Sequence, residues 1–143
     1  MICRGDVRPG DTVEVEIRTD ILFPSGQSQL TPSAHGIIER IGEALRPFPN
    51  ALNVEGHTDN VPISTTLFPS NWELSAARAA SVVHLLTERG VAPSRLTVIG
   101  YADQQPLRSN ATAEGRNANR RVLIVVRGAP DTDAVQVATA TES

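Results

Sequence analysis

LNVEGHTDN (residues 52–60) and, after a proline-containing loop, SNWELSAARAASVVHLLTERG (residues 70–90) describe a strand followed by a long helix. The first stretch begins with alternating apolar and polar residues, which is the pattern of a half-buried strand. Ser70 and Glu73 have the spacing of a capping box, and Gly90 stands where glycine favours the end of a helix. A strand–loop–helix unit therefore forms the middle of the predicted fold.

Elements on either side of this unit follow from the same kinds of pattern. Residues 12–18 alternate strictly, which predicts another half-buried strand, and the apolar run at 122–126 suits a central strand. Thr31 followed by proline has the form of a helix N-terminus, and isoleucines recur at helical spacing until Pro47. The remaining predicted elements are a strand at residues 95–101 and a short helical turn near residues 113–118.

The order of these elements is βαβαβ, a short helix and a last strand. It predicts an α/β sandwich of two layers, with a mixed four-stranded sheet and helices on one face. The core must be mostly aliphatic, because the chain of 143 residues holds only three Phe, one Tyr and one Trp. We expect an N-terminal lead-in at residues 1–11, one domain at residues 12–128 and a disordered tail at residues 129–143.

Composition narrows the classes of partner. The 16 acidic and 13 basic residues give a net charge of −3, and every basic residue is an arginine. The absence of lysine excludes Schiff-base chemistry and a P-loop lysine, and no basic stripe marks a nucleic-acid partner. No apolar run approaches the roughly 20 residues that span a bilayer, so we expect a water-soluble part of a longer anchored protein. The single Cys3 has no metal-ligand spacing and is expected to be a free thiol.

Charged candidates for a binding site lie in separate segments. Asp59 follows the middle strand, and α/β folds collect ligands at the carboxyl ends of strands. Arg78 lies two turns into the long helix, so its side chain can return toward that crevice. A surface ion pair of Arg78 with Asp59 or Glu73 explains its position equally well. Arg120 and Arg121 adjoin the last strand, so only one of the two can face the same site.

A catalytic or metal site has weaker support. His57 and Asp59 form an H-x-D pattern, but the other two histidines fall on predicted helices without a partner at ligand spacing. Ser64, Ser70 and Ser75 lack the G-x-S-x-G context of a nucleophile elbow, and Ser75 is expected to face its own helix or solvent. We expect no catalytic residues, no metal ligands and no cofactor. A metal-dependent wall hydrolase using His57 and Asp59 is the weaker alternative.

Several motifs follow one another along the chain: Phe23-Pro24-Ser25-Gly26, Gly56-His57-Thr58-Asp59, Asn71-x-x-Leu74-Ser75-x-x-Arg78-Ala79, Gly100-Tyr101-Ala102 and Asn119-Arg120-Arg121-Val122. Together they resemble the OmpA/MotB C-terminal family of peptidoglycan-binding domains. The match covers about residues 12–128, and the order of the motifs makes it specific. One departure is Ala102-Asp103, at a place where glycine and an acid are common in the family.

The resemblance implies a role for particular residues. In that family, the acid and the arginine at the positions of Asp59 and Arg78 bind the diaminopimelate residue of the cell-wall stem peptide. Asn71, Thr58 and Arg120 are the further candidates for hydrogen bonds to the peptide. An ammonium suits the carboxylate and a carboxylate suits the guanidinium fork, so the chemistry agrees with the resemblance.

The loop at residues 60–70 looks like the flagellar stator branch of the family. That branch implies a homodimeric periplasmic domain that anchors a motor stator to the wall. It also implies a stator channel subunit as partner, reached through an N-terminal inner-membrane segment that this chain lacks. The alternatives are the wall anchor of an outer-membrane protein or lipoprotein, and a dimerisation or scaffold module in which the arginines contact protein.

Overall fold

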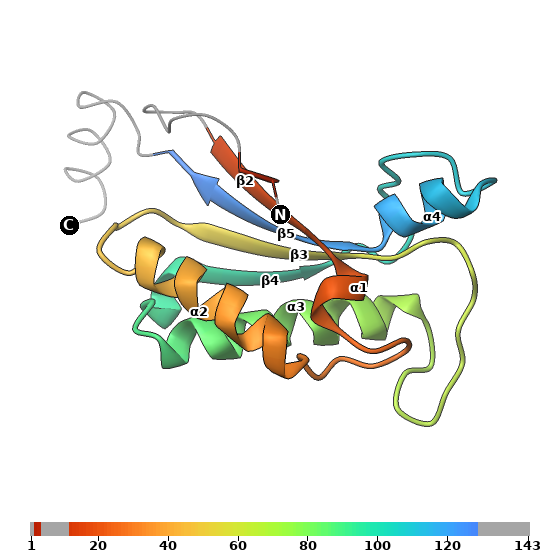
Figure 1. Ribbon diagram of the computed structural model, residues 1–143, viewed down its shortest axis with the longest axis horizontal. Coiled ribbons are helices and arrows are strands. Elements are labelled where there is room, and N and C mark those ends of the chain that lie inside the picture. The colour runs from red at the N-terminus through yellow and green to blue at the C-terminus, as the bar shows by residue number, and fades with distance from the viewer. Residues whose placement is uncertain (1, 4–11, 129–143) are drawn as a thin grey trace, which may run out of the picture.

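A computed structural model describes residues 2–3 and 12–128 of the chain. It shows one mixed sheet that is covered on one face by two long helices, which confirms the expected fold class (Figure 1). No helix in this part of the chain is both long and apolar enough to cross a membrane. The strands are β1 (Ile2–Cys3), β2 (Thr12–Arg18), β3 (Leu52–His57), β4 (Leu96–Gly100) and β5 (Arg121–Arg127), and the helices are α1 (Thr19–Leu22), α2 (Pro32–Leu45), α3 (Asn71–Glu88) and α4 (Ala113–Asn119).

The sheet has the order β1-β2-β5-β3-β4, so the strand β5, which contains the apolar run 122–126, is internal, as predicted. It pairs antiparallel with β2 and β3, and β3 pairs parallel with β4. The short strand β1, which pairs with Val15 and Glu16, extends the four predicted strands at one edge. Most of the expected lead-in and the expected tail at 129–143 lie outside the described residues. Because β2, β3 and β4 run in the same direction, all three end at the same end of the sheet.

Local capping groups fix the ends of the two long helices. The Thr31 hydroxyl accepts the N–H of Ala34 at 3.2 Å at the start of α2, and the Ser70 hydroxyl accepts the N–H of Trp72 at 3.1 Å at the start of α3. Gly90 follows α3 with a φ of +96°, a conformation that favours glycine. All three signals were predicted from the sequence because each is made within a few residues.

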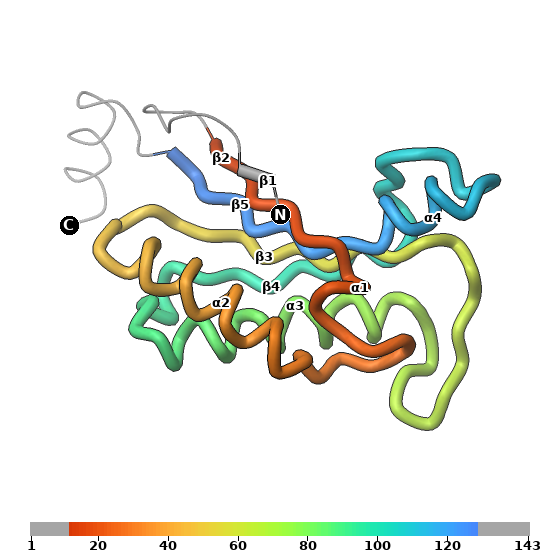
Figure 2. The backbone as a smooth tube through the Cα atoms, in the orientation of Figure 1, coloured from red at the N-terminus to blue at the C-terminus, as the bar shows by residue number. Residues whose placement is uncertain are grey.

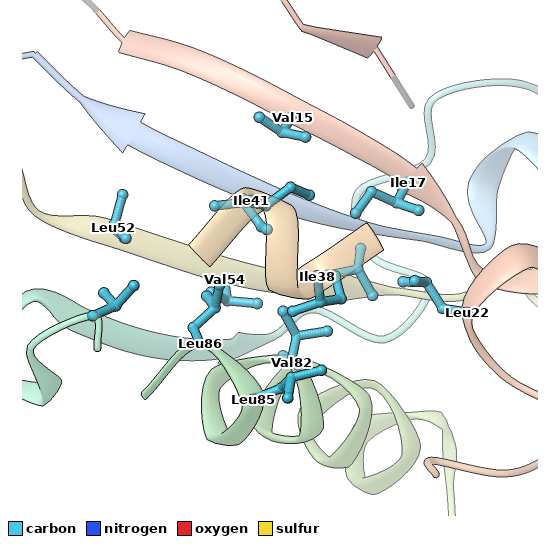
Figure 3. Packing of buried hydrophobic residues seen from close by; sticks show 14 of the residues in the cluster. Val15, Ile17, Leu22, Ile38, Ile41, Leu52, Val54, Val82, Leu85 and Leu86 are labelled. Atoms are coloured by element: carbon cyan, nitrogen blue, oxygen red, sulfur yellow. The ribbon is translucent and has the colours of Figure 1, made fainter. Parts of the chain in front are cut away.

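An aliphatic core fills the space between the sheet and the helices α2 and α3 (Figure 3). Val54 of β3, Ile38 of α2 and the α3 residues Val82 and Leu86 have exposed fractions of 0%. Burying side chains of this size contributes about 1.5–3 kcal/mol each. Ala79 faces this core with an exposed fraction of 0%, whereas Ala77, which lies two residues away around the helix, is half-buried.

The single-turn helix α1 was not predicted. It turns the chain at the end of β2, where the N–H of Thr19 donates to the backbone oxygen of Arg120 at 2.8 Å. The segment that follows passes over α3, and the Ser81 hydroxyl donates to the backbone oxygen of Ser28 at 2.5 Å. These long-range contacts place the segment 23–28 beside the first turns of α3.

Candidate functional site

A pocket of about 660 Å³ opens where β2 and β3 end. Figure 2 shows that α1, the loop that leads into α3, and α4 gather at this same end of the sheet. The pocket thus combines segments that are far apart in the sequence. Its lining includes all five predicted binding residues, Thr58, Asp59, Asn71, Arg78 and Arg120.

Asp59 lies immediately beyond β3 with an exposed fraction of 7%. Its Oδ1 accepts the N–H of Val61 at 3.0 Å, and its Oδ2 lies 2.5 Å from Nη1 of Arg120. The preceding residue fixes the backbone, because the N–H of Thr58 donates to the backbone oxygen of Ala102 at 2.8 Å. The carboxylate is therefore held at the floor of the pocket with charged and neutral donors on separate oxygens.

Arg78 reaches the pocket from α3 and has an exposed fraction of only 5%. Its Nε–H donates to the backbone oxygen of Gln27 at 2.8 Å, and its Cζ lies 5.2 Å from the centre of the Phe23 ring. Burial, followed by the nearby charge of Arg120, lowers the pKa of the Arg78 guanidinium to about 10, although Asp59 acts in the opposite direction. The group is still a cation at neutral pH.

Arg78 does not form the surface ion pair that was the alternative explanation of its position. Within the described residues it has no carboxylate partner, and Asp59 pairs instead with Arg120. The register of the sheet explains this choice, because His57 lies opposite Arg121 and the segment that follows β3 therefore lies beside Arg120. The side chain of Arg78 is held away from Asp59 by its hydrogen bond to the segment that follows α1. A buried guanidinium thus faces the pocket with its two terminal nitrogens directed to no described acceptor.

The other predicted residues have distinct places. Asn71 donates from Nδ2 to the backbone oxygen of Val61 at 3.0 Å, which ties the 60–70 loop to the start of α3. The Thr58 hydroxyl donates to the backbone oxygen of Asp59 at 2.8 Å. Arg120, which sequence reasoning ranked as a supporting residue, makes the one ion pair of the pocket recorded for the described residues.

Arg121 leaves the pocket, as expected from strand geometry. It lies on the sheet face opposite the helices, with Nη2 donating to the backbone oxygen of Gln105 at 3.1 Å and Nε 3.8 Å from Glu16. Burial lowers the pKa of the Arg121 guanidinium, and the carboxylates of Glu16, Glu55 and Glu14 partly oppose that effect. Its role is structural.

His57 does not share a site with Asp59. The imidazole Nε2 lies 3.1 Å from Oε1 of Glu55, and the ring stacks on Tyr101 with the ring centres 5.0 Å apart. His57 is not among the pocket residues, whereas Asp59 lines the pocket because it lies beyond the end of β3, where the alternation of the strand no longer applies. Across residues 2–3 and 12–128, no three His, Cys, Asp or Glu side chains gather as a metal site would require.

Ser75 has a structural task that the sequence did not predict. It is fully buried, donates to the backbone oxygen of Trp72 at 3.0 Å and accepts the N–H of Ala102 at 3.1 Å. The expectation that it faces its own helix is confirmed, and the option that it faces solvent is wrong. Its second bond joins α3 to the loop after β4.

Ala102 is the one non-glycine residue of the described chain with a positive φ, at 53°. We expect Ala102→Val to lower the free energy of unfolding by about 2 kcal/mol, because a β-branched residue is strained in this conformation. The control Ala102→Gly should stay within about 0.5 kcal/mol of the native protein, since relief of strain offsets the greater freedom of the unfolded chain. Urea unfolding measures the free energy of unfolding of both variants. Equal values for the two variants would contradict the strain expected at this position.

Some lining residues were missed by sequence reasoning. Asp20 comes to the pocket through the unpredicted turn α1, and Val61 and Ile63 come through the loop before α3. Arg116 reaches the pocket from α4, with Nη1 donating to the backbone oxygen of Asn110 at 2.9 Å. Only Arg116 had a sequence signal, because it belongs to the arginine-containing segment that also holds Arg120. The others depend on contacts between distant segments.

Comparison with known proteins agrees with the fold and the motifs. The model of the OmpA family matches residues 22–120. This chain belongs to the OmpA family. It is 38% identical over 124 residues to Motility protein B of Bacillus subtilis (strain 168), a match that covers 83% of this chain and 47% of the relative. It is 38% identical over 107 residues to the Peptidoglycan-binding protein ArfA of Mycobacterium tuberculosis (strain ATCC 25618 / H37Rv), a match that covers 74% of this chain and 32% of the relative.

A solved structure extends the comparison. The domain is similar, with a TM-score of 0.78 and 42% identity, to the cell wall anchor of the T6SS from Pseudomonas aeruginosa, with 82% of each chain covered. The departure at Ala102 lies within the region of the family match. The chain spans about half the length, or less, of the curated relatives described above.

Proposed function

We propose that this OmpA-family domain binds peptidoglycan noncovalently, holding the diaminopimelate residue of a stem peptide between Asp59 and Arg78. The observation that carries the proposal is the buried guanidinium of Arg78, which faces the pocket without a carboxylate partner among the described residues. A buried charge without a partner costs free energy, and a ligand carboxylate recovers it. The planar guanidinium fork suits a carboxylate in particular.

The remaining groups of the pocket complement the rest of such a ligand. Diaminopimelate carries an ammonium beside its second carboxylate, and Asp59 supplies the opposite charge. Thr58 and Asn71 add polar groups to the same wall. The names of the relatives support this assignment, since one is called peptidoglycan-binding and a structural neighbour is called a cell wall anchor. The position of the His57 imidazole outside the pocket supports a role in binding over one in hydrolysis.

We further propose that the domain lies in the periplasm and anchors a flagellar stator to the wall as a homodimer. The similarity to Motility protein B supports this assignment, and the similarity to a T6SS wall anchor supports a second candidate, the wall anchor of another envelope assembly. The stator channel subunit is then a partner of the whole protein. A full-length gene product without an N-terminal membrane helix would argue for the second candidate.

Binding to purified sacculi tests the site. We expect Asp59→Asn and Arg78→Met each to lower the affinity for sacculi about tenfold or more, because each removes one charged hydrogen-bonding partner of the ligand. Both substitutions preserve side-chain size, so thermal unfolding should remain cooperative. The measurement is the fraction of domain that sediments with sacculi over a range of sacculus concentrations.

Two variants of matched charge provide the controls. Asp103→Asn removes an acid and Arg127→Met removes an arginine, and neither residue lines the pocket. Both controls should sediment like the native domain, which separates a site effect from an effect of net charge. Normal sedimentation of the Asp59 and Arg78 variants would refute the proposed site.

A further inference from the structure

The carboxylate of Asp59 is paired within the protein itself. Its Oδ2 lies 2.5 Å from Nη1 of Arg120, and only 10% of the Asp59 side chain is exposed. There is little room for two cations at one carboxylate of such low exposure. A ligand ammonium that reaches Asp59 must therefore take the place of the guanidinium of Arg120.

Displacing Arg120 changes the charge balance of the pocket. Arg78, Arg116 and Arg120 line it together with two acids, Asp20 and Asp59. The charge of Arg120 already disfavours the charged form of Arg78. A ligand that brings only an ammonium would pair with Asp59 and leave the positive charges of the arginines with less negative charge nearby. A ligand that brings a carboxylate as well restores the balance, because opposite charges at a few ångströms attract strongly in a partly buried site.

The backbone of Arg120 is fixed by hydrogen bonds, whereas its side chain has few partners. Its backbone oxygen accepts the N–H of Thr19 at 2.8 Å, and its N–H donates to the backbone oxygen of Arg116 at 3.1 Å. Apart from Asp59, the side chain has only a long contact of 3.4 Å to Oδ1 of Asn117 among the described residues, and it is 37% exposed. The guanidinium can therefore leave Asp59 without disturbing the fold.

We propose that Arg120 sets the ligand specificity of the pocket by competing for Asp59. The site then selects a stem-peptide residue that carries an ammonium and a carboxylate on the same centre, and it rejects a residue that carries the ammonium alone. This inference rests on the proposed function, because it takes the ligand to be a stem peptide. It gives Arg120 a role as a competitor rather than as a simple hydrogen-bond donor to the peptide.

Calorimetric titration with two soluble tripeptides tests this role. One peptide is L-Ala-D-Glu-meso-diaminopimelate, and the other has L-lysine in the third position and so lacks the second carboxylate. The proteins are the native domain, Arg120→Gln and the charge-matched control Arg127→Gln, whose side chain is exposed and outside the pocket. The quantity compared is the ratio of the two dissociation constants for each protein.

We expect the native domain and Arg127→Gln to prefer the diaminopimelate peptide by about tenfold or more. In Arg120→Gln the lysine peptide should bind about fivefold more tightly than to the native domain, because Asp59 is no longer covered, and the ratio should fall. An unchanged or larger ratio in Arg120→Gln would overturn the inference while leaving the proposed function standing. Failure of the native domain to bind the diaminopimelate peptide would overturn both.

Discussion

Replacing Gly56 with alanine is expected to lower the free energy of unfolding by about 3 kcal/mol or more, one of the two largest effects expected for this domain. A Cβ at this position would lie 2.0 Å from the backbone oxygen of Ser75 and 2.8 Å from its carbonyl carbon. Both atoms belong to the backbone of α3, which cannot rotate away as a side chain could. The helix would have to move off β3, which separates Arg78 from Asp59. We therefore expect sacculus binding to fall together with stability.

Gly36 provides the matched control. It lies on an exposed position of α2, and a Cβ added there would have no neighbouring atom within 4 Å, so Gly36→Ala should raise the free energy of unfolding by about 0.5–1 kcal/mol. Urea unfolding followed by circular dichroism measures both variants. If Gly56→Ala proved as stable as the native domain, the close approach of α3 to β3 would be wrong.

Replacing Asn119 with alanine is expected to cost about 3 kcal/mol. The side chain is fully buried, and its Oδ1 accepts the N–H groups of Leu107 and Arg108 at 2.7 and 2.8 Å. Its Nδ2 donates to the backbone oxygen of Arg108 at 2.8 Å and to Oδ1 of Asn110 at 2.9 Å. Removing the amide leaves several polar groups of the loop without partners, each at a cost of about 1–3 kcal/mol if it stays buried.

Losing the hydrogen bonds of Asn119 should also disturb the pocket, because Arg120 follows Asn119 directly in the chain. Asn53→Ala is the matched control, since Asn53 is half-buried and its side chain forms none of the hydrogen bonds recorded for the described residues. We expect that control to stay within about 1 kcal/mol of the native domain. Thermal and urea unfolding give the comparison, and similar losses in both variants would show that the Asn119 network contributes little.

The parts of the fold that the sequence predicted well are those in which short-range rules decide. The strict alternation of residues 12–18 gives β2 with the predicted bounds, and Thr31, Ser70 and Gly90 mark helix ends through contacts to nearby residues. The apolar run at 122–126 could be assigned to an internal strand because a strand buried on both sides has no polar alternation. These signals do not depend on which distant segment lies beside them.

The residues proposed from the sequence lie together in one pocket, but their pairing and part of the lining were not predicted. The motif resemblance pointed to Asp59 and Arg78, and both line one pocket. The ion pair of Asp59 with Arg120 could not be predicted, because it depends on the register between β3 and β5. The contribution of Asp20 depends likewise on the turn α1, which is held by a bond from Thr19 to Arg120.

The sequence by itself determined the order of the elements, the ends of the long helices and the aliphatic character of the core, and its motifs proposed an acid and an arginine that line one pocket. These properties follow from side-chain periodicity, capping chemistry and motif order, all of which depend on neighbouring residues. Only the tertiary structure decided that Arg120 pairs with Asp59 while Arg78 remains a buried cation without a carboxylate partner among the described residues. The reason is physical: which charges meet depends on strand register and chain packing across about sixty residues of separation, and local propensities carry no information about either.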